Sequence, residues 1–183
     1  LDEFQTYVEL EKLANHLCGL SRPLFFKGVA TVVAKLFNIV KPHIAIFGEK
    51  DYQQLTVIRQ MVRDLNFDVN IIGGLTVRES DGLAMSSRNN YLTAKQRPSA
   101  LALYKALLKA TELVKSGVKD SEQIIQVATR LIHSYPETEI EYISICDPEN
   151  LEDIKTIKKP SLMALAVNVG KTRLIDNMIV KPQ

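Results

Sequence analysis

The sequence predicts an α/β unit built on a parallel sheet, followed by a small α+β domain. Two patterns carry this prediction. Near the start, an apolar run, a helical stripe and a second apolar run follow one another within about 30 residues, the length of a βαβ unit. Later, two helical stripes precede three strand-like runs, an order typical of an α+β domain. We therefore expect two domains, residues 1–77 and 78–183.

The first predicted elements are a short strand and a helix. Residues 6–10 resemble a strand, and residues 28–40 carry apolar side chains at the i, i+3, i+4 spacing of a helix. Pro42 ends that helix, because proline cannot continue its hydrogen bonding.

The βαβ unit itself occupies residues 43–72. Residues 43–47 are almost all apolar, which indicates a strand buried on both faces. Asp51 and Gln54 form a capping-box pattern, and residues 68–72 form the second strand. Two strands joined through a helix should run parallel, with a right-handed crossover. The helix between them carries one apolar stripe: Leu55, Ile58, Val62 and Leu65.

Two further helices open the second domain. Pro98 should bend or restart the first of them, Gly117 should end it, and Pro136 should end the second. Each helix begins at a capping-box pattern: Thr93 with Gln96, and Asp120 with Gln123.

The remaining predicted strands are mostly near the end of the chain. Residues 75–78 should continue the second parallel strand after a bulge at the preceding glycine pair. Three later strands are expected at residues 140–145, 162–169 and 174–180, with a hairpin turn at 170–173 between the last two.

Composition and charge narrow the class of protein. A net charge of +2 gives no argument for binding nucleic acid, and no apolar run reaches the roughly 18 residues of a membrane span. Cys18 and Cys146 lie far apart and fit free thiols in a reducing cytoplasm. His16, His43 and His133 are scattered, so we expect no metal site. From the short apolar runs and the two cysteines we expect no membrane association and a cytoplasmic location.

Two polar loops carry the functional signal. Gly48-Glu49-Lys50-Asp51 follows the first strand of the βαβ unit, and Met85-Ser86-Ser87-Arg88-Asn89 follows the second. Ligands of open parallel sheets bind at the carboxyl ends of strands, where free backbone N–H groups and cationic side chains suit phosphate. The sequence therefore predicts a site for a phosphate-bearing nucleotide. Read structurally, the same residues could be a solvated lysine, a helix cap and an ordinary polar turn.

Three segments, residues 47–55, 81–89 and 172–177, closely resemble the pantoate–β-alanine ligase (pantothenate synthetase) family. The resemblance covers essentially the whole chain but only the later part of the family's sequence, and the family's His-x-Gly-His motif is absent here. It implies a partial Rossmann-like domain of the nucleotidyltransferase superfamily. We therefore expect this chain to be a C-terminal portion of a member of this family and to be inactive by itself.

The resemblance also implies a reaction. Pantoate would attack the α-phosphate of ATP, supplied with Mg²⁺, to give pantoyl adenylate, and β-alanine would then displace AMP to give pantothenate. It implies a cytoplasmic homodimer. Two alternatives stay open: another adenylate-forming enzyme of the superfamily, and a non-catalytic binding or dimerisation module.

Site residues follow from the same resemblance. The catalytic set is Lys50, Ser86, Ser87 and Arg88, and Gln54 would bind pantoate, although the capping box explains it too. Val77 and Met85, which would line the nucleotide pocket, could instead be plain core residues. The full ATP-binding set is Gly48, Glu49, Lys50, Asp51, Val77, Met85, Ser86, Ser87 and Arg88.

One stretch departs from the family pattern. Where relatives read Arg-Pro-Gly-His-Phe-Arg-Gly-Val, this chain places Leu24 and Phe25 at the glycine and histidine positions. We therefore assign no role to Phe25.

Overall fold

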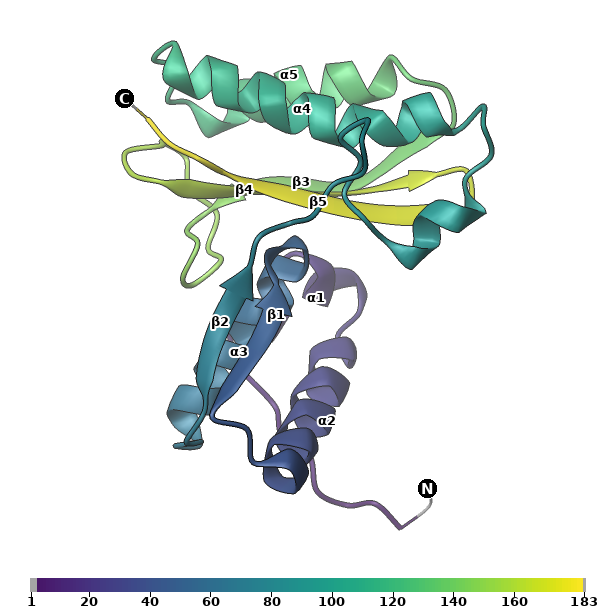
Figure 1. The fold of residues 1–183 in the computed structure, drawn as a ribbon. Coiled ribbons are helices and arrows are strands. Elements are labelled where there is room, and N and C mark those ends of the chain that lie inside the picture. Colours follow the sequence, from purple (N-terminus) through teal and green to yellow (C-terminus); the bar gives the residue numbers. More distant parts are fainter. Residues whose placement is uncertain (1–2, 183) are drawn as a thin grey trace. The chain divides into compact units, whose positions relative to one another are not determined.

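The computed structural model describes residues 3–182, which form two compact units with the division between Leu75 and Thr76. Figure 1 shows a parallel strand pair with helices in the first unit and a three-stranded sheet with two helices in the second. Each unit has its own hydrophobic cluster, so each is described separately.

The first unit is built on a parallel βαβ arrangement, as predicted. Strand β1 pairs with β2 in register from Ile44↔Asn70 to Gly48↔Gly74. The glycine pair at 73–74 belongs to β2 rather than interrupting it. The elements are η1 (Leu13–Asn15), α1 (Cys18–Ser21), α2 (Phe25–Val40), β1 (Ile44–Gly48), η2 (Glu49–Asp51), α3 (Tyr52–Asp64) and β2 (Asn70–Gly74).

The core of this unit lies on one face of the strand pair. Phe37 of α2 and Ile58 of α3 are buried there and pack against Phe47 of β1. The opposite face is open, and Ile46 is 71% exposed. The prediction that residues 43–47 are buried on both faces is therefore wrong, because within this unit helices cover only one side of a two-stranded sheet.

Two other predicted strands do not form. Residues 6–10 belong to no helix or strand and pair with no strand among the described residues. Instead, the Val8 backbone N–H donates to Thr31 Oγ1 of α2 at 2.9 Å. Residues 75–78 do not continue β2, because Arg78 forms an isolated antiparallel bridge with Ala84.

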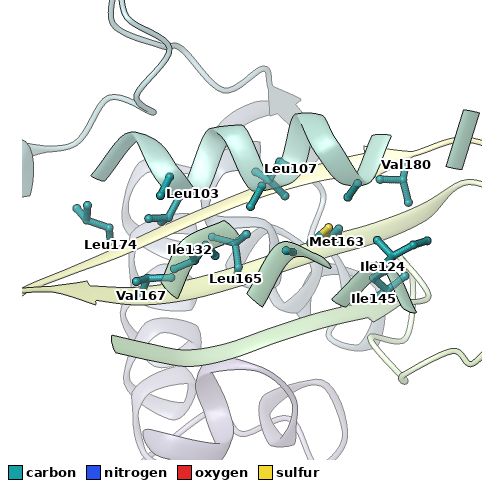
Figure 2. Close-up of a cluster of buried hydrophobic side chains, with 14 of the residues drawn as sticks. Leu103, Leu107, Ile124, Ile132, Ile145, Met163, Leu165, Val167, Leu174 and Val180 are labelled. Atoms are coloured by element: carbon teal, nitrogen blue, oxygen red, sulfur yellow. The ribbon is translucent and has the colours of Figure 1, made fainter. Parts of the chain in front are cut away.

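The second unit is a three-stranded antiparallel sheet in the order β3-β4-β5, with α4 and α5 on one face (Figure 1). Figure 2 shows the buried side chains between these layers, among them Leu107 of α4, Ile132 of α5 and Leu165 of β4. The elements are η3 (Ser87–Tyr91), α4 (Arg97–Lys115), α5 (Ser121–His133), β3 (Thr138–Cys146), β4 (Ser161–Val169) and β5 (Thr172–Val180).

The capping-box bonds form in full just before α4 and in half at the start of α5. Thr93 and Gln96 exchange hydrogen bonds, with Thr93 N donating to Gln96 Oε1 at 3.1 Å and Gln96 N donating to Thr93 Oγ1 at 3.3 Å. Asp120 Oδ1 accepts from Gln123 N at 2.7 Å. After a turn at residues 94–96, α4 begins at Arg97, so Pro98 lies in its first turn, where proline is tolerated; of the two expectations for Pro98, a restart of the helix fits.

The turn between β4 and β5 is tighter than predicted. The two strands pair as far as Val169↔Thr172, so only Gly170 and Lys171 form the turn. Gly170 has φ +56, in the left-handed region that glycine adopts at little cost. The predicted hairpin is confirmed, and its loop is two residues long rather than four.

Both cysteines are buried and outside any disulfide, and Cys146 yields a prediction about pH. Burial raises the pKa of the Cys146 thiol to about 12, and only the thiolate reacts readily with alkylating agents. We expect iodoacetamide at about pH 8 to leave Cys146 unmodified in the folded protein and to label it after unfolding in guanidinium. Peptide mass spectrometry measures both states. Rapid labelling of the folded protein would show that the thiol is accessible and ionised.

Candidate functional site

The predicted site residues of the first unit lie at the carboxyl ends of the two parallel strands. Gly48 ends β1 beside Gly74, which ends β2. Gly48 has ordinary extended dihedrals, φ −68 and ψ 132, so backbone strain does not require a glycine there. A methyl group at Gly48 would meet no atom within 4 Å, so the space next to the strand end is open. Strand ends of this kind are where open α/β sheets bind ligands.

A single 3₁₀ turn, η2, carries the next three residues from β1 into α3. Lys50 is half-buried in this turn, directly before the positive end of the α3 dipole. Glu49 lies over the neighbouring strand, because a methyl group at Gly73 would come within 2.9 Å of Glu49 Oε1. The turn thus presents one cation and two carboxylates at the strand ends.

The predicted capping box at the start of α3 does not form. Asp51 has φ −96 and ψ 58, and its side chain accepts no capping hydrogen bond. The preceding 3₁₀ turn gives the chain a different entry into the helix, which explains the absence of the usual cap geometry. The structural explanation for Asp51 and Gln54 is therefore wrong, and Gln54 stands half-buried in the first turn of α3.

The neighbouring glutamine, Gln53, is a structural residue that the sequence interpretation missed. Its buried amide donates from Nε2 to Leu13 O at 2.9 Å and to His16 O at 2.6 Å. Its Oε1 accepts from Cys18 N at 3.1 Å. These bonds hold residues 13–18 against the start of α3. The only signal in the sequence was the i, i+4 spacing from Gln53 to an apolar residue.

We expect Gln53→Leu to destabilise the first unit by roughly 1–3 kcal/mol, because it leaves buried backbone groups of residues 13–18 without partners. Denaturant unfolding followed by circular dichroism measures the change. Gln60→Leu on the same helix is the matched control, since the Gln60 amide bonds Asp64 at the surface. Equal stability of the two variants would contradict the structural role of Gln53.

In the second unit, residues 77–85 form a small hairpin. Met85 N donates to Val77 O at 2.9 Å, and Glu79 N donates to Leu83 O at 2.8 Å. Val77 and Met85 therefore face each other across the hairpin, with side chains on the same face. Their exposed fractions are 64% and 54%. The alternative that they are core residues is wrong for this chain, since neither is buried.

The polar residues follow directly from this hairpin. Ser86 is extended, with φ −155 and ψ 144, and its Oγ accepts from Arg88 N at 3.2 Å. Ser87 and Arg88 are exposed at the start of η3. The stretch presents hydroxyl and guanidinium groups, the donors that phosphate oxygens accept from.

An ion-pair network holds the base of this stretch. Arg97 of α4 donates to both Asp81 oxygens at 2.7 and 2.8 Å and to Glu79 Oε2 at 2.7 Å. Asn89 donates to Glu79 Oε1 at 2.6 Å and to Ala84 O at 3.1 Å. Hydrogen bonds lower the pKa of Glu79, chiefly from Asn89 and then from Arg97, and the Arg97 bond lowers the pKa of Asp81. Both carboxylates are therefore charged at neutral pH.

The structure thus gathers the predicted residues into two sets. One set, at the end of β1 and the start of α3, is Gly48, Glu49, Lys50, Asp51 and Gln54. The other, on the hairpin and the turn after it, is Val77, Met85, Ser86, Ser87 and Arg88.

Residues 3–182 contain neither a metal-binding cluster nor a membrane-spanning helix. No three histidine, cysteine, aspartate or glutamate side chains there gather closely enough to hold a metal ion. No helix in the same residues is long and apolar enough to cross a membrane.

Comparison with known families gives a match over nearly the whole chain. Residues 2–179 match the family model described as pantoate-beta-alanine ligase. The pantothenate synthetase of Desulfatibacillum aliphaticivorans is 62% identical over 179 residues, which are 98% of this chain and 64% of the relative. That of Syntrophobacter fumaroxidans is 55% identical over 99% of this chain and 64% of its own length. The chain thus spans just under two thirds of the curated relatives it matches.

Solved structures agree with this match. Pantothenate synthetase from Thermus thermophilus is 43% identical, with a TM-score of 0.94 over 99% of this chain and 66% of that one. Pantoate-beta-alanine ligase from Francisella tularensis, solved in complex with beta-gamma ATP and β-alanine, is 34% identical. Its TM-score is 0.74 over 96% of this chain and 58% of that one. The fold is therefore that of a partial Rossmann-like unit of the nucleotidyltransferase superfamily with an α+β domain.

Proposed function

This chain belongs to the pantoate–β-alanine ligase family, and we propose that the complete protein makes pantothenate from pantoate and β-alanine with the cleavage of ATP. The observation that carries the proposal is the turn with Lys50 at the carboxyl end of β1, in a chain 62% identical to a pantothenate synthetase. The relative solved with beta-gamma ATP and β-alanine supports the choice of substrates.

The proposed chemistry has two steps. In the first, a pantoate carboxylate oxygen bonds to the α-phosphorus of ATP, the α–β bridge breaks, and pyrophosphate leaves with pantoyl adenylate formed. In the second, the amine of β-alanine attacks the acyl carbon and the carbon–oxygen bond to AMP breaks. The amine gives up one proton, and the products are pantothenate and AMP.

We assign the charge-stabilising work of the first step to Lys50, with Ser86, Ser87 and Arg88. Negative charge grows on the phosphate oxygens as pyrophosphate departs, and donors fixed in advance stabilise that charge most strongly. Lys50 stands in a turn anchored to a strand, and Ser86 is fixed by its bond from Arg88 N. Fixed donors of this kind need little reorganisation in the transition state.

The remaining residues would bind rather than react. We assign ATP contacts to Gly48, Glu49 and Asp51 through the backbone N–H groups of this turn, because the space at the Gly48 strand end is open. Val77 and Met85 offer an exposed apolar surface suited to a nucleobase. Gln54, whose side chain makes no capping box, is assigned to pantoate.

Mg²⁺ would enter as the counter-ion of the ATP substrate, and we assign it no protein ligand. Its usual partners in such sites are phosphate oxygens and water, with few protein carboxylates. By family resemblance we also propose a cytoplasmic homodimer.

The direct test is an assay of the complete natural protein with ATP, Mg²⁺, pantoate and β-alanine. We expect AMP, pyrophosphate and pantothenate in equal amounts. No AMP release under these conditions would favour a non-catalytic module of the same fold. AMP release with another small acid, but not with pantoate, would favour a different adenylate-forming enzyme.

A further inference from the structure

Residues 172–177, the third segment that resembles the ligase family, have no assigned role in the proposed reaction, yet they include a buried charged side chain. Asp176 of β5 is 3% exposed and accepts two hydrogen bonds from the Arg78 guanidinium. The donors are Arg78 Nη1 at 2.7 Å and Nη2 at 3.0 Å. Such forked arginine–carboxylate pairs fix both distance and orientation. A strand of the sheet therefore holds a side chain that lies 98 residues earlier in the chain.

Arg78 also binds the tip of the hairpin that it belongs to. Its Nη1 donates to Gly82 O at 3.1 Å, and its guanidinium lies 4.0 Å from the centroid of the Tyr104 ring of α4. Gly82 has φ +98, and a methyl group there would come within 2.6 Å of Tyr104 Cδ1. Arg78 thus ties the hairpin to β5 and to α4, in addition to the ion pairs that Arg97 of α4 makes with Glu79 and Asp81.

We propose that Asp176 is a positioning residue for the nucleotide: through Arg78 it fixes the hairpin that carries Val77 and Met85. The role rests on the proposed function, because it assumes that these two side chains contact the nucleotide. Arg78 lies between Val77 and the hairpin tip, and its bridge partner Ala84 precedes Met85. Any movement of Arg78 would therefore move both apolar side chains.

Preorganisation is the physical reason for such an anchor. An isolated two-stranded hairpin is marginally stable in water, so exposed Val77 and Met85 need support from elsewhere to keep one arrangement. When a ligand binds to a disordered surface, the side chains and backbone must become ordered, and the free-energy cost of that ordering weakens the affinity. Removing the Asp176 charge would also leave Arg78 without its ion-pair partner in a poorly solvated place.

The test compares Asp176→Asn with wild type in the complete protein. We expect the KM for ATP to rise about tenfold, the size of effect that ordering one or two side chains produces, with the KM for pantoate nearly unchanged. A merely structural role would lower stability without this division between the two KM values. Hydrogen exchange without nucleotide should show faster exchange of the Val77-to-Met85 amides in the variant.

Two further variants keep the test decisive. Arg78→Lys retains the charge but not the fork, so it should reproduce the rise in KM for ATP even where Asp176→Asn folds poorly. Glu141→Gln is the matched control, since Glu141 forms a similar forked pair with Arg173 on the same sheet and outside the hairpin. It should leave the KM for ATP unchanged.

The outcomes separate this role from the proposed function. Wild-type protein that neither turns over pantoate nor binds a fluorescent ATP analogue overturns the proposed function and this role with it. Active wild-type protein in which Asp176→Asn and Arg78→Lys match Glu141→Gln overturns the role alone. Faster hydrogen exchange of the hairpin together with an unchanged KM for ATP would also overturn the role of Asp176, because the hairpin's order would then not affect nucleotide binding.

Discussion

Replacing Lys50 with alanine in the complete protein is expected to slow adenylate formation about a hundredfold, the usual cost of losing one preorganised contact to developing charge, ~3 kcal/mol. Lys50 lies in the turn that ends β1, ahead of α3, where a cation gains from an adjacent anion. Because the contact strengthens as charge develops, the rate should fall more than the affinity for ATP. Pantoate-dependent exchange of labelled pyrophosphate into ATP measures the step.

Two companion variants sharpen this result. Lys50→Arg keeps a cation and should lose less than Lys50→Ala. Lys35→Ala removes an equal charge from α2, where Lys35 lies over the Phe4 ring at 4.6 Å, and should leave the exchange rate unchanged. Exchange by Lys50→Ala within threefold of wild type would exclude Lys50 from the chemistry.

Leu107→Ala is expected to destabilise the second unit by about 2–5 kcal/mol, the range for emptying a buried leucine site. Leu107 is 0% exposed on α4 and packs towards the sheet in the cluster of Figure 2. The cost combines the lost transfer free energy with the cavity left behind. Denaturant unfolding of the complete protein, followed by circular dichroism, measures it.

The adjacent residue supplies the control for this experiment. Leu108 is 41% exposed on the same helix, so Leu108→Ala removes the same atoms with a smaller loss of buried area. We expect it to cost less than about 1 kcal/mol. Similar losses for both variants would mean that α4 presents a different face to the sheet.

Local patterns predicted the fold well wherever neighbouring residues determine the structure. The capping boxes before α4 and α5 depend on side chains three residues apart. The one at Thr93 and Gln96 is confirmed, and of the one at Asp120 and Gln123 only the Asp120 half forms. The parallel pairing of β1 with β2 followed from the helix between them. The exposed face of β1 could not be predicted, because burial depends on what packs against a strand.

Long-range contacts explain most of the other differences. Residues 6–10 have strand-like composition, but the backbone N–H of Val8 donates to the Thr31 side chain on a helix instead of to a partner strand. Gln53 and Gln54 look alike in sequence, and only the tertiary structure separates the buried one from its neighbour. The pairing of Arg78 with Asp176 spans 98 residues. The assigned roles of the site residues stay predictions.

The most direct measurement follows the oxygen of the pantoate carboxylate. With pantoate labelled by ¹⁸O in its carboxylate, the proposed attack on the α-phosphorus leaves one labelled oxygen in the bridge, and β-alanine then releases it with AMP. We predict one ¹⁸O atom in each AMP formed by the complete protein and none in pyrophosphate. Unlabelled AMP, or label in a released phosphate product, would contradict the acyl-adenylate route.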